Sequence, residues 1–269
     1  MNLMSVSTNT FTPSFSQFVC LSGLPRAGST LLSAILSQNP LIHAEGNSAV
    51  CQIMWDTHVS CLTKAVEQLK ANNRENTVFD LVSQIPHIYY KNIPEKIVVD
   101  KCRSWTVEPN FNMLKHYIDK NIKIIILERK IIDVVKSFAK LYRKNGIHDE
   151  TKENNLVLPN SEPVMRSLNG IQWAKNNNQI NSFLFINYDD LINNTKETVD
   201  KIYEFCGWEK FKHDFNNIFP KYPENDEVYQ LPGQHSIRPT IKADKSFVKL
   251  NETLEKKCNI IDNIYFIKK

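Results

Sequence analysis

The sequence FVCLSGLPRAGSTLLSAILSQNP, residues 18–40, predicts a buried strand, a tight loop and an amphipathic helix in direct succession. The loop runs from Gly23 to Thr30 and has the outline of a phosphate-binding loop. Ser29 stands where the ATP-binding pattern GxxxxGK[ST] has lysine, and the nearest cation is Arg26. Because the N–H groups at a helix N-terminus attract anions, the stretch still predicts a phosphate site.

Length and composition favour one globular domain. The chain has 269 residues, of which 42% are hydrophobic and 23% are charged, enough for one sizeable core. The formal net charge of +4 is small, and the charges are spread along the sequence, which argues against a nucleic-acid partner. A small positive charge is compatible with a pocket that binds an anionic small molecule. We expect the polar residues 1–15 to form a flexible N-terminus and residues 16–269 to form the domain.

The cysteines and the absence of long apolar segments bear on the cellular compartment. The six cysteines form no CxxC pair and no metal-ligand spacing, which indicates reduced thiols. The chain begins without a basic and then apolar leader, and no segment reaches the about 20 apolar residues of a membrane span. We therefore expect a cytoplasmic protein that binds no metal and no membrane.

Four short apolar runs predict strands that are buried on both faces. They occupy residues 18–22, 96–99, 123–127 and 183–187. Helical patterns lie between and after them, at residues 29–38, 48–71, 77–91, 111–119, 131–144, 163–180 and 195–206. This alternation predicts an α/β fold with a central parallel β-sheet flanked by helices. Residues 145–162 are predicted to form a surface loop and residues 208–246 a long irregular arm.

A basic residue follows three of the four predicted strands. Arg26 comes after the first strand, Lys101 after the second and Arg129 after the third. Parallel sheets bind ligands at the carboxyl ends of their strands, so we expect these cations to converge on one edge. The convergence points to an anionic ligand more specifically than any single motif does.

Three segments together resemble the motifs of sulfotransferases that use 3′-phosphoadenosine-5′-phosphosulfate (PAPS). They are SGLPRAGSTLLSAILSQNP, LERKIIDVVKSFAKLY at residues 127–142 and FINYDDLINNTKETVDKIYEFCGW at residues 185–208. The first is closest to the PRSGTT form of tyrosylprotein and related bacterial enzymes. The resemblance implies a P-loop NTPase-like sulfotransferase fold. It also implies transfer of a sulfuryl group to a hydroxyl or amine, release of adenosine 3′,5′-bisphosphate (PAP), and no metal.

The resemblance implies where the donor binds. Its 5′-phosphosulfate would be cradled by the loop residues Arg26, Ala27, Gly28, Ser29 and Thr30. Its 3′-phosphate would be held by Arg129 and by Ser137, which lies eight residues, or two helical turns, further on. Tyr188 would border the nucleotide, and Ser236 and Arg238 in LPGQHSIRP would return over it.

The resemblance also implies the catalytic groups. Lys101 would stabilise charge on the leaving phosphate, with Arg26 beside the sulfuryl group. The acceptor hydroxyl needs a general base, and Glu45 is the first carboxylate after the loop helix. A direct count from the loop arginine puts Asn47 at the position of the family's glutamate, so Glu45 takes this role only with a two-residue shift. His43 is the competing base.

Two other functions remain open at this point. The run KIVVD ends in Asp100, in the manner of a strand whose aspartate holds Mg²⁺, which favours a P-loop kinase that uses MgATP. A non-catalytic nucleotide-binding module would keep the donor site and lack a base. The sequence leaves the acceptor undetermined among a small molecule, a sugar and a tyrosine peptide, and it does not determine the oligomeric state.

Overall fold

The described residues form one five-stranded parallel sheet. The computed structural model describes residues 14–177, 181–242 and 248–266, so most of the predicted flexible N-terminus lies outside the described residues. The strand order is β2-β3-β1-β4-β5. The strands are β1 (Gln17–Gly23), β2 (Ile42–His43), β3 (Ile97–Lys101), β4 (Lys123–Glu128) and β5 (Phe183–Asn187).

Continuous apolar runs produce the central strands because both faces of the sheet are covered. β1 lies between β3 and β4, and its residues Val19, Cys20 and Leu21 are fully buried. The register pairs Leu21 with Lys101 and Gly23 with Leu127. These pairings bring the carboxyl ends of the three central strands to one edge, as predicted.

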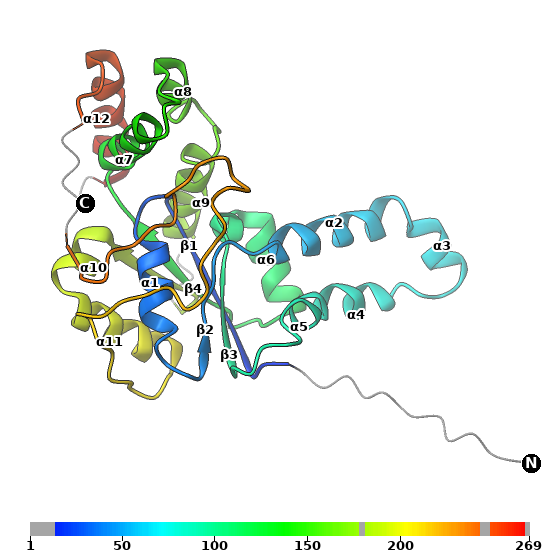
Figure 1. Cartoon of the computed structure of the whole chain (residues 1–269). Coiled ribbons are helices and arrows are strands. Elements are labelled where there is room, and N and C mark those ends of the chain that lie inside the picture. The colour runs from blue at the N-terminus through cyan, green and yellow to red at the C-terminus, as the bar shows by residue number, and fades with distance from the viewer. Residues whose placement is uncertain (1–13, 178–180, 243–247, 267–269) are drawn as a thin grey trace, which may run out of the picture.

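Helices cover both faces of the sheet (Figure 1). α1 (Ser29–Leu36) and α11 (Thr195–Cys206) lie on one face, and α6 (Glu108–Tyr117) and α9 (Met165–Asn176) lie on the other. The short helix η1 (Arg103–Thr106) packs between α9 and β1. Two further helices, α7 (Ile131–Lys144) and the C-terminal α12 (Glu252–Phe266), pack against each other above the carboxyl ends of the strands in the view of Figure 1.

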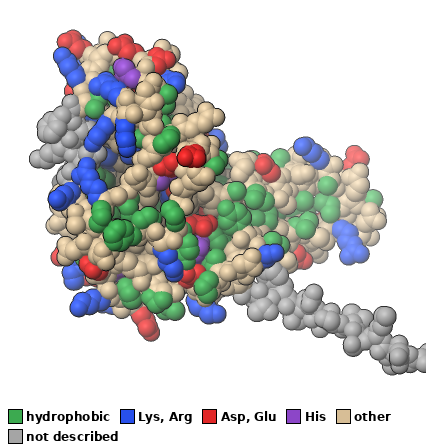
Figure 2. Space-filling view, in the orientation of Figure 1, with side chains coloured by type: hydrophobic (Ala, Val, Ile, Leu, Met, Phe, Trp, Pro, Cys, Tyr) green, Lys and Arg blue, Asp and Glu red, His purple; other side chains and the backbone are tan. Residues whose placement is uncertain are grey.

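Four helices form a projection that extends away from the sheet (Figure 1). They are α2 (Val50–Thr63), α3 (Val66–Ala71), α4 (Thr77–Ser83) and α5 (Ile85–Tyr89). The two long helices predicted for this region are thus each divided in two. Figure 2 shows hydrophobic side chains gathered on the projection, and the exposed ones are Ile53, Leu62, Phe79, Leu81, Ile88 and Tyr89.

The four predicted strands are confirmed, and the elements missed by the sequence reasoning are short or terminal. β2 has only two residues, too few to show a periodicity. α8 (Glu150–Asn155) lies inside the predicted surface loop, and the side chain of Asp149 caps it. α10 (Tyr188–Asn193) begins directly after β5, where the Asn187 side chain accepts from the N–H of Asp189 (2.8 Å).

Residues 208–242, called the arm below, contain no helix or strand, which agrees with the prediction for this part of the chain. In Figure 1 the arm crosses in front of α1 and the sheet. It folds back on itself where the N–H of Ile218 donates to the carbonyl of Pro239 (2.8 Å). Lys221 and Tyr222 both donate to the Glu95 carboxylate, at 2.8 and 2.5 Å. These contacts attach the arm to the body although it lacks regular structure.

All six cysteines are free thiols, and five of them are buried. Burial raises the pKa of Cys206 and of Cys258 to about 12. These two side chains therefore stay protonated and unreactive near neutral pH. None of the described helices is both long enough and apolar enough to cross a membrane.

The join between β1 and the loop gives a test of the fold. Gly23 has φ 128, and a Cβ at this position would lie 2.2 Å from the carbonyl oxygen of Leu127. We expect Gly23→Ala to lower the free energy of unfolding by at least about 3 kcal/mol, since backbone strain and a clash add together. Urea denaturation measures the loss.

The matched control is Gly146→Ala. Gly146 also has a positive φ, of 66, but no atom lies within 4 Å of the place where its Cβ would stand. This variant should lose only about 1–2 kcal/mol, the cost of the left-handed backbone alone. Equal losses in the two variants would show that the β4 backbone yields and that the close approach is not a constraint.

Candidate active site

The loop after β1 takes its shape from two residues in the left-handed region. Arg26 has φ 60 and Gly28 has φ 93. A Cβ on Gly28 would lie 3.0 Å from the Leu191 side chain, so the loop packs closely against α10. α1 begins at Ser29, and Gly28 has no side chain to cap its first N–H groups, which are therefore available to an anion. Ala27 is fully buried and can meet a ligand only through its backbone.

A cavity of about 240 Å³ lies above this loop. Its wall comes from the loop, the ends of β1 and β3, and parts of α7, α10 and the arm. The basic residues in the wall are Arg26, Lys101, Arg103, Arg129, Arg238 and Lys242. No carboxylate belongs to the described wall. Since the whole chain carries a net charge of only +4, positive potential is concentrated here, as an anionic ligand requires.

Arg129 connects the predicted phosphate ligands. It follows the last residue of β4, and its Nη1 donates to the carbonyl of Arg26 (2.7 Å). Its guanidinium lies over the Tyr188 ring, 4.0 Å from the centroid. Its Nε is buried, and no described residue accepts a hydrogen bond from it. Ser137 on α7 accepts from Arg26 Nε (3.1 Å), so the strand end, the loop and the helix meet at one place.

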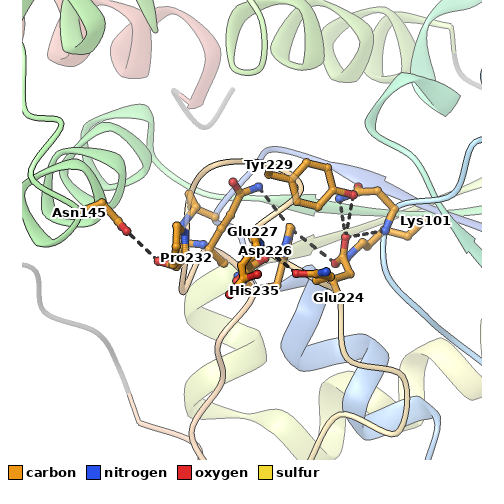
Figure 3. Close-up of polar contacts among 12 residues, drawn as sticks. Lys101, Asn145, Glu224, Asp226, Glu227, Tyr229, Pro232 and His235 are labelled. Carbon is orange, nitrogen blue, oxygen red and sulfur yellow. Dashed lines mark hydrogen bonds and ion pairs between the residues drawn. The ribbon is translucent and has the colours of Figure 1, made fainter.

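The arm supplies the remaining wall of the cavity. The carbonyl of Gln234 accepts from Arg26 Nη1, and the predicted residues Ser236 and Arg238 both line the cavity. Figure 3 shows how this part of the arm is held near α7, where the Asn145 side chain donates to the carbonyl of Pro232 (3.1 Å). The arm therefore lies beside the loop, and the role of Ser236 and Arg238 toward the nucleotide stays a prediction.

A buried ion pair ties the arm to the end of β3 (Figure 3). Lys101 Nζ lies 2.8 Å from Glu224 Oε2, with the two side chains only 5% and 10% exposed. Glu224 Oε1 accepts from the backbone N–H and the side-chain amide of Asn47, at 3.0 and 3.2 Å. Burial opposes ionisation of Glu224, but Lys101 and Asn47 outweigh it and lower the pKa of this carboxyl. Burial also lowers the pKa of Lys101, with Glu224 opposing that change.

His235 extends this cluster, and the sequence reasoning gave it no role. Its Nδ1 lies 2.6 Å from Asp226 Oδ1, and its backbone N–H donates to Asp226 Oδ2 (3.0 Å). Its Nε2 lies 3.5 Å from Glu224 Oε2. Figure 3 shows Asp226, His235 and Glu224 grouped on the arm, facing Lys101 on the sheet.

The two predicted bases lie beside the first cavity and not in its wall. His43 is buried at the end of β2, with Nε2 3.1 Å from Glu45 Oε2 and Nδ1 3.6 Å from Glu95 Oε2. Glu45 lines a second cavity of about 270 Å³. Asn47, the residue in direct register with the family's glutamate, lines the first cavity instead.

The two cavities share part of their walls. Thr30, Lys101, His235, Ser236 and Ile237 line both of them. A group bound in the first cavity and a group bound in the second would therefore meet beside Lys101 and His235. Two cavities that meet at a lysine can hold two substrates side by side, which is the arrangement that a group-transfer reaction requires.

Asp100 does not face either cavity. Its carboxylate is fully buried, and it accepts from Tyr90 Oη (2.8 Å) and from Trp105 Nε1 (2.7 Å). Burial raises its pKa against these hydrogen bonds. The interpretation of Asp100 as a magnesium ligand is therefore wrong: inside the core, the side chain joins β3 to η1 and to the residue that follows α5.

The sequence reasoning gave no binding role to several residues of the wall. They are Asn47, Arg103, Gln234, His235, Thr240 and Lys242. Arg103 had a usable signal, because it lies two residues beyond Lys101 at the same strand end. Gln234 and His235 lie in LPGQHSIRP, the segment predicted to return over the nucleotide, but an irregular segment has no periodicity that would fix which of its side chains face inward.

Comparison with solved structures supports the fold. The sulfotransferase domain of the Synechococcus PCC 7002 olefin synthase superposes with a TM-score of 0.58 at 18% identity, covering 97% of this chain and 98% of that one. The sulfotransferase domain of the curacin biosynthetic pathway gives 0.55 at 17% identity, covering 94% and 98%. Mouse sulfotransferase SULT7A1, in complex with PAP, gives 0.52 at 12% identity, covering 96% and 86%.

Sequence comparison then gives the family. No curated protein sequence matches the chain. A family model described as "Sulfotransferase family" matches residues 19–213, a range that holds the loop, Lys101, Arg129 and Tyr188. This match covers well over half of the 269 residues. The chain belongs to the sulfotransferase family.

Proposed function

We propose that this protein transfers a sulfuryl group from PAPS to a hydroxyl or amine and releases PAP. The observation that carries the proposal is the basic cavity, in which a helix N-terminus, Arg129 and the hydrogen-bonded pair Arg26–Ser137 lie together without a described carboxylate in the wall. PAPS carries a 5′-phosphosulfate and a separate 3′-phosphate, and so needs more than one anion-binding group. Mouse SULT7A1, whose fold this chain shares, was solved in complex with PAP.

The donor would be divided between the loop and the end of β4. The 5′-phosphosulfate would lie on the first N–H groups of α1, beside the hydroxyls of Ser29 and Thr30. The 3′-phosphate would accept a hydrogen bond from the buried Nε–H of Arg129, which has no acceptor among the described residues. The stacking of Arg129 on Tyr188 keeps the guanidinium in this position.

Sulfuryl transfer, like phosphoryl transfer, asks the protein mainly for positioning and charge stabilisation. Lys101 is the cation shared by the two cavities, and it would stabilise the charge that develops on the leaving 5′-phosphate. Arg26 would stabilise the charge on the sulfuryl oxygens from the loop side. Glu45 lines only the second cavity and remains a proposed base, with His43 behind it.

The acceptor would enter through the second cavity and an adjoining depression. Three tyrosines line this depression beside Glu45, namely Tyr89, Tyr222 and Tyr229. Val228, which is 75% exposed, lies at its rim. Such a surface suits an acceptor with an aromatic or apolar body and one hydroxyl. Transfer of radiolabelled sulfate from PAPS to phenols, alkanols, sugars and tyrosine peptides would identify the class.

The donor proposal predicts a ligand preference. PAP should raise the midpoint of thermal unfolding in a concentration-dependent way, because a ligand that binds the folded state stabilises it by mass action. MgATP should give a much smaller shift, since the loop has Ser29 in place of the usual lysine and Asp100 is buried. Equal shifts for the two nucleotides, with the ATP effect abolished by EDTA, would support a kinase instead.

The role of Arg129 predicts a second outcome. Arg129→Ala should weaken PAP binding by about 2 kcal/mol or more, roughly thirtyfold, because it removes a charge-assisted contact from a phosphate. Binding of 5′-AMP, which has no 3′-phosphate, should weaken much less. Calorimetric titration of both nucleotides measures the difference.

Arg166→Ala is the matched control for that experiment. Arg166 is exposed on α9 and pairs only at the surface with Glu162 (3.3 Å), so its loss should leave both affinities unchanged. If Arg129→Ala instead weakens PAP and 5′-AMP equally, Arg129 acts only by supporting the carbonyl of Arg26 and does not bind the 3′-phosphate.

A further inference from the structure

The arm carries a histidine and a carboxylate in the arrangement of an oriented general base. Asp226 receives two hydrogen bonds from one residue, from the backbone N–H of His235 (3.0 Å) and from its Nδ1 (2.6 Å). The two side chains are only 10% and 14% exposed. A ring held at both the backbone and Nδ1 has little freedom to rotate, so the direction of Nε2 is fixed.

The Asp226 contact also determines the tautomer. A carboxylate can only accept, so the proton of the neutral imidazole lies on Nδ1 and Nε2 carries the lone pair. The Gln234 side-chain amide, 3.3 Å from Nε2, can donate to that lone pair. The same orientation by a carboxylate prepares the histidine of a hydrolase triad to accept a proton at Nε2.

His235 lies at the place where the two proposed substrates would meet. It is one of the residues that line both cavities, together with Lys101 and Thr30. Glu45, in contrast, lines only the second of these two cavities, and its Oε2 lies 3.1 Å from His43 Nε2. A general base must reach the acceptor hydroxyl when that hydroxyl attacks sulfur. His235 satisfies this requirement because it lies where the two cavities meet.

A carboxylate beside the junction, that of Glu224, is a poor base. Glu224 lies 2.8 Å from Lys101 and accepts two further hydrogen bonds from Asn47. Tyr229 Oη also lies within 3.4 Å of its carboxylate. With its oxygens engaged by four donors, Glu224 is stabilised as the ion and has little tendency to take a proton.

We infer that His235, positioned by Asp226, is the general base that accepts the proton of the acceptor hydroxyl. The inference rests on the proposed PAPS-dependent transfer. The acceptor O–H bond breaks and its proton passes to His235 Nε2, while the acceptor oxygen forms a bond to sulfur. The bond from sulfur to the bridging oxygen breaks, and its electron pair leaves with the 5′-phosphate of PAP beside Lys101. The imidazolium is then stabilised by Asp226 and Glu224.

The surroundings of His235 suit this role near neutral pH. Burial lowers its pKa, an effect that the nearby Lys101 reinforces and that Glu224 and Asp226 oppose. The imidazole is therefore largely neutral at pH 7 and able to accept a proton. Besides these three charged groups, Gln234 and Tyr229 lie beside the ring, and the ring centroid of Tyr229 is 5.6 Å away.

The first test is turnover, measured as transfer of radiolabelled sulfate from PAPS to 2-naphthol and to 2-phenylethanol. His235→Gln should lower kcat about 10²–10⁴-fold while PAP affinity stays within about twofold of wild type. The loss should be larger with the alkanol, whose hydroxyl gives up its proton less readily. Added imidazole should restore part of the activity of His235→Ala.

His213→Gln is the matched control. His213 lies on the same arm and bonds Tyr203 Oη through Nε2 (2.9 Å), outside both cavities, so kcat should be unchanged. Glu45→Gln should lose less than about tenfold. If Glu45→Gln abolishes turnover and His235→Gln retains it, Glu45 is the base and the inference is overturned.

The positioning role of Asp226 has its own readout. Because the carboxylate stabilises the imidazolium, Asp226→Asn should lower kcat and move the acidic limb of the kcat–pH profile to lower pH. A structural role alone would lower kcat without moving the limb.

A measurement without any acceptor completes the test. Nitrogen-15 NMR of the PAP complex, with His235 assigned by its loss in His235→Gln, should find Nδ1 protonated and Nε2 bare at pH 7. A proton on Nε2 would overturn the inference whether or not turnover is detected. If wild-type protein fails to bind PAP at all, the proposed function fails instead, so the two failures are distinguishable.

Discussion

The buried pair between Lys101 and Glu224 is the interaction on which the organisation of the site depends. Lys101 is fixed by its place at the end of a central strand, and an ammonium that is 5% exposed must have a partner. Glu224 provides it from a segment without regular structure. Removing one member of such a pair leaves an uncompensated buried charge, at a cost of about 3–5 kcal/mol. The pair therefore determines where the arm lies and, with it, where Asp226 and His235 lie.

The basic cavity follows from the parallel sheet in a different way. Each of the central strands ends at the same edge, and each is followed by a basic residue. Six positive side chains around one cavity would repel one another. Glu224 pairs with Lys101, whereas Arg26 and Arg129 have backbone carbonyls as partners. Arg26 bonds the carbonyl of Gln234, and Arg129 bonds the carbonyl of Arg26. Backbone acceptors hold the guanidinium groups without cancelling their charge, so the cavity stays electropositive.

The elements with strong local signals were predictable. The four long strands have continuous apolar runs, the loop at residues 23–30 has its glycines, and the helix that carries Ser137 has an apolar periodicity. Each of these signals lies within a short stretch of sequence. The split helices of the projection and the two-residue strand β2 were not predictable, since their limits depend on contacts with other elements. Asp100 shows the same dependence for a single residue. Its sequence context fits a magnesium ligand, and only the packing of Tyr90 and Trp105 around it reveals a core hydrogen-bond acceptor.

By itself, the sequence determined the α/β class, the edge of the sheet at which the site lies and the cations at the strand ends. It could do so because strand ends and glycine loops are set by local backbone geometry. The tertiary structure alone decided which groups stand opposite Lys101. Glu224 lies 123 positions along the chain from Lys101, and the residues from 224 to 235 carry no periodic pattern. The position of residues 224–235 follows from the burial of the Lys101 ammonium against the Glu224 carboxylate. This interaction exists only once the chain has folded.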